Sequence, residues 1–191
     1  MLATGTRARR LPFGKELDGI VELRTLEDAR KLRAAIASNP RVVVVGAGFI
    51  GMEVAASCRK KGLEVTVVEP LPAPLIRGLG SVLGERVART HRDEGVVFRL
   101  GAGVDGFEGE GSVTGVRLSD GEMLPAELVI VGVGAAPATE WLDGAGIDID
   151  NGVLCDATGS TSREGVYALG DCARWENAKY PERPRFEHWT S

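Results

Sequence analysis

Apolar residues in the first third of the chain follow a pattern that predicts a βαβ unit. The run 41–45 is apolar after its first residue, which is typical of a central parallel strand buried on both faces. Residues 50–61 repeat apolar positions at helical spacing, and Gly62 is placed to end this helix. Residues 64–69 predict a second strand, and the whole unit has the length of about 30 residues that a βαβ motif needs.

A further helix is expected before this unit. Thr25 can cap its first turn, and Asp28 stands at the position that makes an approximate capping box. The dipeptide Asn-Pro at 39–40 is placed to end the helix. Four apolar residues at helical spacing form a stripe along it: Leu26, Ala29, Leu32 and Ile36.

Beyond residue 80 the pattern changes twice. Residues 81–94 predict a helix, and 95–100 predict a third strand. Short segments between 103 and 126 then predict an antiparallel meander with a hairpin signal at 119–121. A continuous apolar strand that ends in glycines follows at 127–134. Two later segments also resemble strands, 146–156 and 164–171.

Composition excludes several classes of protein. The 191 residues suffice for one large domain or two small ones, and 43% apolar with 26% charged residues is ordinary for a soluble globular protein. The net charge of −4 gives no broad electrostatic reason to expect nucleic acid as a partner. No apolar stretch reaches the roughly 18 residues that a membrane span needs, so no membrane association is expected. The three cysteines lack redox or zinc spacing, so we expect neither a disulfide nor a metal site, and a cytoplasmic location fits.

The glycine-rich turn has the pattern G-x-G-x-x-G, which gains force because a predicted strand precedes it and a predicted helix follows it. Gly46 would allow the tight turn, Gly48 would leave room for a pyrophosphate, and Gly51 would let the helix pack closely on the strand. The main-chain N–H groups where the helix begins, at Phe49 and Ile50, would face the phosphates. The pattern therefore predicts a dinucleotide site. The alternative is a turn that serves packing alone.

An acidic residue ends the second predicted strand. Glu69 could accept hydrogen bonds from both hydroxyls of the adenosine ribose, and it would repel a 2′-phosphate, which predicts NAD rather than NADP. Arg77 opens two alternatives, since it could form an ion pair with Glu69 or reach a phosphate. In a third interpretation Glu69 is only a solvated strand end.

Five stretches along the full length of the chain carry a family resemblance: LATGTRARRLP, VVVVGAGFIGMEVA, VIVGVGAAP, VYALGDCA and FEHW. They resemble the FAD- and NADH-dependent ferredoxin reductases, in the pyridine nucleotide-disulfide oxidoreductase superfamily. The resemblance implies a flavoprotein that passes electrons from NADH through FAD to a ferredoxin or rubredoxin. It also implies an α/β fold, with a Rossmann-like dinucleotide-binding domain of parallel sheet and antiparallel β-meander, plus part of an FAD-binding domain.

The same resemblance divides the chain into three segments. Residues 1–11 would be the end of a first FAD-domain segment, residues 12–137 the NAD-binding domain, and residues 138–191 an incomplete second FAD-domain segment. Because no first glycine motif for FAD is present, the chain is expected to be a truncated fragment of a longer protein. By itself it is expected to bind NAD(H) weakly, to hold no FAD and to transfer no electrons.

The resemblance also assigns roles to single residues outside the glycine turn. Glu53 and Gly134 would lie near the nicotinamide half of NAD. Five residues are assigned to the FAD site of the parent protein: Thr4, Gly5, Gly170, Asp171 and Trp189. Transfer between two cofactors demands little of side-chain acids and bases, so no catalytic residue is assigned.

Other interpretations stay open at this point. The parent protein could be an NADH oxidase or a disulfide reductase of the same build, or the chain could be a non-enzymatic NAD-binding module. The basic cluster of Arg7, Arg9 and Arg10 could be a solvated loop or a docking patch for an acidic ferredoxin. His91 is expected to be solvated on its helix, and Cys58 to pack a helix onto the sheet. The sequence leaves the oligomeric state undecided.

Overall fold

The computed structural model describes residues 1–180 and 183–185, and the chain divides into two compact units. We call Ala8–Gly134 the central unit, and Met1–Arg7 together with Ala135–Ser191 the terminal unit. Both divisions fall within a few residues of the boundaries expected at 11 and 137, while the assignment of NAD and FAD to the segments stays a prediction. None of the helices in the described part of the chain is long and apolar enough to cross a bilayer.

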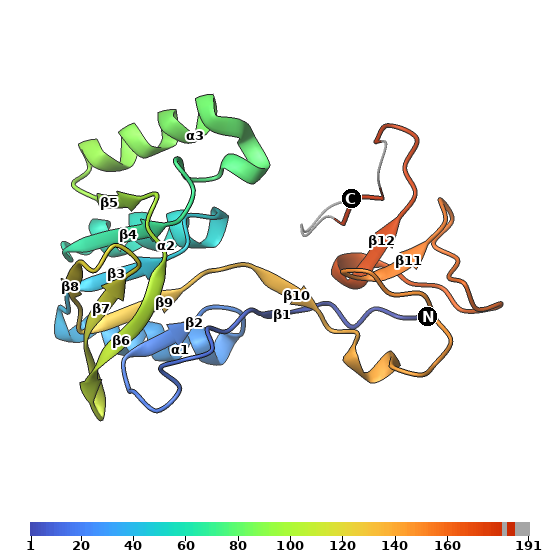
Figure 1. Cartoon of the computed structure of the whole chain (residues 1–191), viewed down its shortest axis with the longest axis horizontal. Coiled ribbons are helices and arrows are strands. Elements are labelled where there is room, and N and C mark those ends of the chain that lie inside the picture. Colours follow the sequence, from blue (N-terminus) through green and yellow to red (C-terminus); the bar gives the residue numbers. More distant parts are fainter. Residues whose placement is uncertain (181–182, 186–191) are drawn as a thin grey trace. The chain divides into compact units, whose positions relative to one another are not determined.

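The central unit is built on a parallel sheet of five strands (Figure 1). Every neighbouring pair of strands in this sheet runs parallel. The predicted βαβ unit is confirmed, because the helix α2 (Phe49–Lys60) follows β3 and leads into β4. The order across the sheet is β2 (Ile20–Glu22), β9 (Leu128–Val131), β3 (Val42–Val45), β4 (Val65–Glu69) and β5 (Val97–Leu100).

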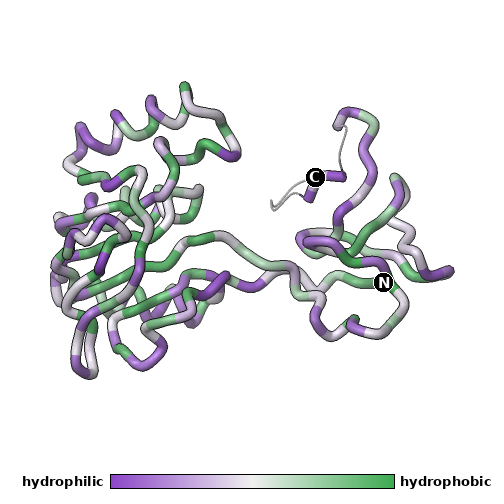
Figure 2. The backbone as a smooth tube through the Cα atoms, in the orientation of Figure 1, coloured by the Kyte–Doolittle hydropathy of each residue, from purple (hydrophilic) through white to green (hydrophobic). Residues whose placement is uncertain are grey.

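The two faces of this sheet are covered differently. On one face Val42 and Val44 of β3 share a core with residues of two helices, α2 and α1 (Leu26–Ala35). On the other face Val43 and Val45 share a second core with the meander. All four valines are buried, as the apolar run predicts. In Figure 2 the run through β9 is visible as a continuous apolar stretch of the central unit.

The predicted meander is confirmed. Its three strands are antiparallel, and two register shifts interrupt the pairing of the first two. They are β6 (Val104–Glu110), β7 (Ser112–Leu118) and β8 (Met123–Pro125).

Three details of the central unit differ from the sequence prediction. Helix α3 (Ile76–Asp93) begins before residue 81, because Gly80, at φ 75° and ψ 173°, joins two helical segments across a kink. The edge strand β2 has only three residues, which is too short for a periodic signal to predict. In the apolar stripe of α1, which the short 3-10 helix η1 (Ile36–Ser38) continues, Leu32 is buried, whereas Leu26 in the first turn is 68% exposed.

The terminal unit contains short strands around a small core. Strand β1 (Thr6–Ala8) pairs with β10 (Ala135–Pro137), and β11 (Val153–Cys155) pairs in parallel with β12 (Ala173–Trp175). A 3-10 helix, η2 (Glu140–Leu142), contributes Leu142 to the core.

The prediction of a strand at 164–171 is wrong. Residues there form isolated bridges, with Tyr167 facing Ser160 and Ala168 facing Leu2. A 3-10 helix, η3 (Gly170–Cys172), then follows. Glycines at positive φ on both sides of the bridges end the extended run, which is why the apolar pattern overestimates the strand.

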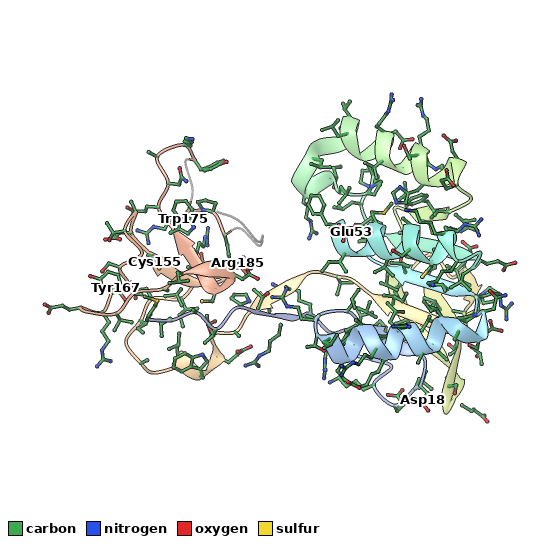
Figure 3. The ribbon with its side chains drawn as sticks, turned by 180° about the vertical axis from the view of Figure 1, so that it is seen from behind. Asp18, Glu53, Cys155, Tyr167, Trp175 and Arg185 are labelled. Atoms are coloured by element: carbon green, nitrogen blue, oxygen red, sulfur yellow. The ribbon has the colours of Figure 1, made fainter. Side chains whose placement is uncertain are left out.

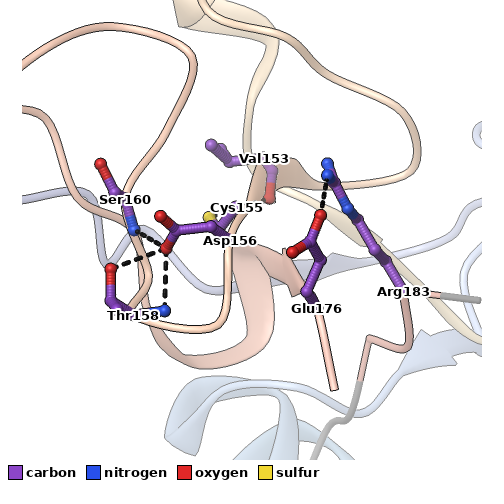
Figure 4. A network of polar contacts seen from close by, with 7 residues as sticks. All are labelled: Val153, Cys155, Asp156, Thr158, Ser160, Glu176 and Arg183. Atoms are coloured by element: carbon purple, nitrogen blue, oxygen red, sulfur yellow. Dashed lines mark hydrogen bonds and ion pairs between the residues drawn. The ribbon is translucent and has the colours of Figure 1, made fainter. Parts of the chain in front are cut away.

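Hydrogen bonds order the loop after β11 (Figure 4). Asp156 Oδ1 accepts bonds from the hydroxyl and the N–H of Thr158 at 2.7 and 2.8 Å, and from the N–H of Ser160 at 2.9 Å. The bond from the Thr158 hydroxyl, followed by the two main-chain bonds, lowers the pKa of Asp156 below its usual value. Arg183 pairs with Glu176 nearby. These contacts give Asp156 a structural role in the turn.

Candidate functional site

Two glycines of the turn are required by packing within the protein. Gly46 has φ +98°, and a Cβ there would lie 2.4 Å from the carbonyl oxygen of Gly132. A Cβ on Gly51 would lie 2.1 Å from the carbonyl oxygen of Gly46. A larger residue at Gly51 would force the helix away from the strand, and one at Gly46 would force the turn away from the segment that follows β9. These contacts agree with the tight turn and the close helix–strand packing expected from the sequence.

Gly48 is different, because nothing in the protein requires a glycine there. Its φ of −75° and ψ of −176° suit any residue, and a Cβ would meet no atom within 4 Å. Serine, asparagine or aspartate would cap the helix better than glycine does. The missing side chain therefore leaves open space directly over the start of α2.

The start of α2 presents main-chain donors to this space. Gly48 is the N-cap residue and gives no side-chain cap, and the first N–H that bonds back to it is that of Met52, at 3.0 Å from the Gly48 oxygen. Among the residues that the structure describes, no protein acceptor is recorded for the N–H groups of Phe49, Ile50 and Gly51. Such donors, together with the helix dipole, favour an anion.

The side chains of Phe49 and Ile50 flank the same region. They are 59% and 44% exposed. The ring of Phe49 lies over the first segment of α3, since a Cβ on Gly78 would sit 3.1 Å from its Cε2 atom. An apolar surface therefore borders the helix start.

Glu69 points at the glycine turn. Its Oε2 atom accepts the N–H of Ala47 at 2.8 Å, and its Oε1 atom accepts the N–H of Leu71 at 3.1 Å. A carboxylate oxygen can accept two bonds, so each oxygen keeps a lone pair for a ribose hydroxyl. Arg77 is exposed, and among the described residues no ion pair joins it to Glu69. The alternative in which Arg77 pairs with Glu69 is therefore not observed.

Two further residues are assigned to NAD, one on the same helix and one distant in the sequence. Glu53 is exposed on α2, where Figure 3 labels it, and its carbonyl oxygen accepts the hydroxyl of Ser57. Gly134 follows β9 at φ +97°, and its carbonyl oxygen accepts the N–H of Arg9 at 2.9 Å. Gly132, which sequence reasoning did not single out, is the neighbour that makes Gly46 obligatory.

In the terminal unit, residues from both ends of the chain converge. The hydroxyl of Thr4 donates to the carbonyl oxygen of Ala138 at 2.8 Å, and the Ala138 N–H donates to the carbonyl oxygen of Gly5 at 2.9 Å. The Thr6 hydroxyl lies 3.4 Å from Asp171 Oδ2. These bonds bring together the segments assigned to FAD at the two ends of the chain.

Open space also surrounds two glycines assigned to FAD. Gly5 and Gly170 have φ of +66° and +70°, and a Cβ on either would meet no atom within 4 Å. Trp189, the fifth residue of the predicted FAD set, lies outside the described residues, as do its neighbours Glu187 and His188.

Several other expectations can be compared with the structure. Cys58 packs α2 into the sheet core as predicted, and burial raises the pKa of its thiol. His91 is half-buried rather than fully solvated, with its Nε2 atom 3.2 Å from the carbonyl oxygen of Met52. Two arginines of the basic cluster form ion pairs, Arg7 with Glu140 and Arg10 with Glu22. These ion pairs leave less free positive charge for a docking patch.

Comparison with known proteins decides which of the families with this fold is present. A family model described as pyridine nucleotide-disulphide oxidoreductase matches residues 1–191. The chain belongs to this family.

Individual members of the pyridine nucleotide-disulphide oxidoreductase family are similar over most of this chain. Rhodocoxin reductase of Rhodococcus erythropolis is 42% identical over 92% of the chain. The ferredoxin–NAD(+) reductase subunit of the benzene 1,2-dioxygenase system of Pseudomonas putida is also 42% identical over 92% of the chain. The crystal structure of a ferredoxin reductase from Rhodopseudomonas palustris superposes with a TM-score of 0.93, at 40% identity over 97% of the chain. The chain spans 42%, 43% and 46% of the lengths of these three oxidoreductases.

Proposed function

We propose that this chain forms the NAD(H)-binding part of an FAD-dependent reductase, which passes electrons from NADH to a ferredoxin or rubredoxin. The observation that carries the nucleotide part of the proposal is the open space at Gly48, because the fold itself demands Gly46 and Gly51 but not Gly48. A glycine that packing does not require, beside N–H groups with no recorded protein acceptor, fits a ligand that approaches the backbone closely.

The residues present fit the diphosphate and ribose of NAD(H). The N–H groups of Phe49 and Ile50 would donate to the diphosphate, and Glu69 would accept from the ribose hydroxyls with its remaining lone pairs. Glu53 and Gly134 remain proposed neighbours of the nicotinamide. Arg77 is available to a phosphate, which would moderate the preference for NAD over NADP.

The electron-transfer part of the proposal rests on the relatives, whose names specify rhodocoxin and ferredoxin as partners. Residues 12–137 would form the NAD-binding domain, while residues 1–11 and 138–191 would contribute to the FAD site. When bound, FAD would accept a hydride and pass on its two electrons one at a time.

Within the FAD part, the convergence of Thr4 and Gly5 with the segment that holds Asp171 supports the assignment. Thr4, Gly5, Gly170 and Asp171 would bind FAD, and the role of Trp189 is proposed from sequence alone. We further propose a cytoplasmic location, which three free and buried cysteines support.

The nucleotide part is tested by alanine substitution of two glycines. Gly48→Ala should lower the thermal midpoint by at most about 4 °C, because its Cβ meets nothing and alanine is only a poorer N-cap than glycine, but it should weaken NADH binding about tenfold or more by filling the space for the diphosphate. Gly51→Ala should instead lower the free energy of unfolding by about 2 kcal/mol or more, because its Cβ would overlap the Gly46 carbonyl oxygen.

Ser57→Ala, on an exposed turn of the same helix, is the matched control and should change neither quantity. Binding is measured by NADH fluorescence titration and stability by thermal unfolding. If the unmodified chain binds NADH and Gly48→Ala binds it equally well, the proposed position of the diphosphate is wrong.

The electron-transfer part needs a different measurement. An enzyme preparation that contains this sequence and FAD should reduce ferricyanide and a ferredoxin or rubredoxin with NADH. An NADH oxidase would consume oxygen instead, and a disulfide reductase would require a disulfide substrate. Failure to oxidise NADH with any of these acceptors, together with retained NADH binding, would favour a non-enzymatic NAD-binding module.

A further inference from the structure

Leu75 has a backbone conformation that is unusual for its residue type. Among the described residues, the structure records three non-glycine residues at positive φ, which are Asn39, Leu75 and Asn151. Asparagine tolerates this left-handed region, whereas a leucine there is strained. Leu75 has φ 55° and ψ 12° at the N-cap of α3. Strain of this kind persists where the surrounding structure enforces it, and it is common at functional sites.

The strained residue bonds directly to the glycine turn. The N–H of Leu75 donates to the carbonyl oxygen of Ala47 at 2.9 Å, while the N–H of Ala47 donates to Glu69 at 2.8 Å. Ala47 stands between Gly46 and Gly48 and is 1% exposed. The two peptide groups that flank Ala47 are therefore held from two sides, one by Glu69 and one by Leu75.

Packing from α3 keeps Leu75 in place. We call residues 70–75, which connect β4 to α3, the strap. Ala73 is 5% exposed, and a Cβ on Gly84 would lie 2.3 Å from the carbonyl oxygen of Pro74, so α3 presses directly on the strap. The side chain of Leu75 packs against the helix-side core of the central unit. Close contact on both sides can hold a backbone conformation that the isolated segment would avoid.

We propose that Leu75 is a positioning residue for the dinucleotide. Its left-handed backbone directs its N–H to the Ala47 carbonyl oxygen. This bond keeps the turn in the arrangement in which the N–H donors of α2 face the diphosphate. This inference rests on the proposed NAD(H)-binding function. Without the bond from Leu75, the turn would populate other arrangements, and the measured affinity would fall with the fraction of chains that can bind.

The test compares Leu75→Gly with Leu75→Val. Glycine adopts positive φ freely and keeps the N–H but loses the side chain, whereas valine keeps most of the side chain but resists this backbone. If the N–H of residue 75, placed by its left-handed backbone, positions the turn, Leu75→Gly should bind NADH within about threefold of the unmodified chain. Leu75→Val should bind NADH about tenfold more weakly than the unmodified chain. If Leu75 acts only through side-chain packing, the order of the two affinities is reversed.

Two further measurements separate positioning from general stability. NADH titrations are run well below the thermal midpoint of each variant, so that unfolded protein does not enter the affinity. Amide hydrogen exchange at residue 75 should be slow in the unmodified chain and in Leu75→Gly, and fast in Leu75→Val.

Leu83→Gly and Leu83→Val are the matched controls, because Leu83 lies in α3 and is 54% exposed. Both control variants should bind NADH like the unmodified chain. If Leu75→Gly does not fold, Leu75→Asn replaces it.

The outcomes distinguish this inference from the proposed function. If the unmodified chain does not bind NADH, the proposed function fails and the role of Leu75 fails with it. If the unmodified chain binds NADH and Leu75→Val binds it as tightly as Leu75→Gly, or more tightly, only the role of Leu75 is overturned.

Discussion

Three glycines within six residues serve two separate physical purposes. A Cβ on Gly46 would lie 2.4 Å from the Gly132 carbonyl oxygen, and a Cβ on Gly51 would lie 2.1 Å from the Gly46 carbonyl oxygen. Gly46 therefore lets the turn pack against the segment after β9, and Gly51 lets the helix pack onto the strand. Gly48 has an ordinary backbone and open surroundings, so its value lies in what can approach from outside. A residue-level test of the nucleotide site therefore belongs at Gly48 and at the carboxylate of Glu69.

Substitution of Glu69 should change the preference between the two nicotinamide cofactors. Glu69→Ala removes the acceptor for the ribose hydroxyls, which weakens NADH binding, and also removes the charge that repels a 2′-phosphate. NADH affinity should fall about tenfold, and NADPH affinity should fall less, so that the ratio narrows. The affinities for NADH and for NADPH should both decrease, because the N–H groups of Ala47 and Leu71 also lose their acceptor.

Fluorescence titration with each cofactor measures this ratio. Glu69→Gln keeps the shape and one acceptor oxygen, so its ratio should lie between those of the unmodified chain and Glu69→Ala. Equal binding of NADPH and NADH by the unmodified chain would contradict the proposal that Glu69 sets the preference for NADH.

At the scale of elements, two helices of the central unit begin in opposite ways. Helix α1 has a complete capping box, in which the Thr25 hydroxyl accepts the N–H of Asp28 and the Asp28 carboxylate accepts the N–H of Thr25. Helix α2 begins at Gly48 with no side-chain cap. The first helix therefore has a side-chain acceptor for the N–H of its third residue, whereas the second helix has no side-chain acceptor at its start.

The destabilisation caused by removing the cap on α1 should depend on pH. Thr25→Ala should lower the free energy of unfolding by about 1 kcal/mol near neutral pH. Partial burial raises the pKa of Asp28, but hydrogen bonds from the Thr25 side chain and from the N–H groups of Thr25 and Arg24 outweigh it, so the pKa is lowered. A lowered pKa stabilises the fold above the unfolded-state value of about 3.9, and this contribution is lost as the pH falls through the folded value.

The difference between Thr25→Ala and the unmodified chain should therefore shrink below about pH 4. Urea denaturation at a series of pH values measures it. Ser38→Ala at the other end of the same helical region is a control without a carboxylate partner. A difference that stays constant down to pH 3 would contradict the cap as the source of the pH dependence.

At the scale of the whole molecule, every residue proposed to hold the diphosphate and the ribose lies within Ala8–Gly134. This unit has a five-stranded sheet with an apolar core on each face, so it has the features of an independently folding domain. Residues assigned to FAD lie in the other unit, where the core is small. The two cofactors are thus assigned to different compact units.

Expression of residues 8–134 alone should give a folded protein that binds NADH within about threefold of the full chain. The reason is that the turn, Glu69 and the strap are all retained. Thermal unfolding and NADH titration measure the two properties, and the same fragment with Gly48→Ala is the control. A fragment that folds cooperatively but does not bind NADH would show that residues outside 8–134 are needed.

The sequence by itself determined the local features, because each depends on residues that are close along the chain. Four consecutive valines predicted the buried strand β3, the glycine spacing predicted the turn and the start of α2, and alternating short segments predicted the meander. The role proposed for the carboxylate at the end of β4 also comes from its position in the βαβ unit, and it stays a prediction.

Only the tertiary structure decided features that depend on residues far apart in the sequence. The edge strand β2 has three residues and becomes a strand only because β9 pairs with it. Gly48 could be separated from its neighbours only when the surroundings of each Cβ were known. Leu75 carries no local signal at all, since its left-handed backbone is imposed by α3 on one side and bonded to the glycine turn on the other. Local patterns record what a segment prefers, whereas strain and open space arise only from how segments pack together.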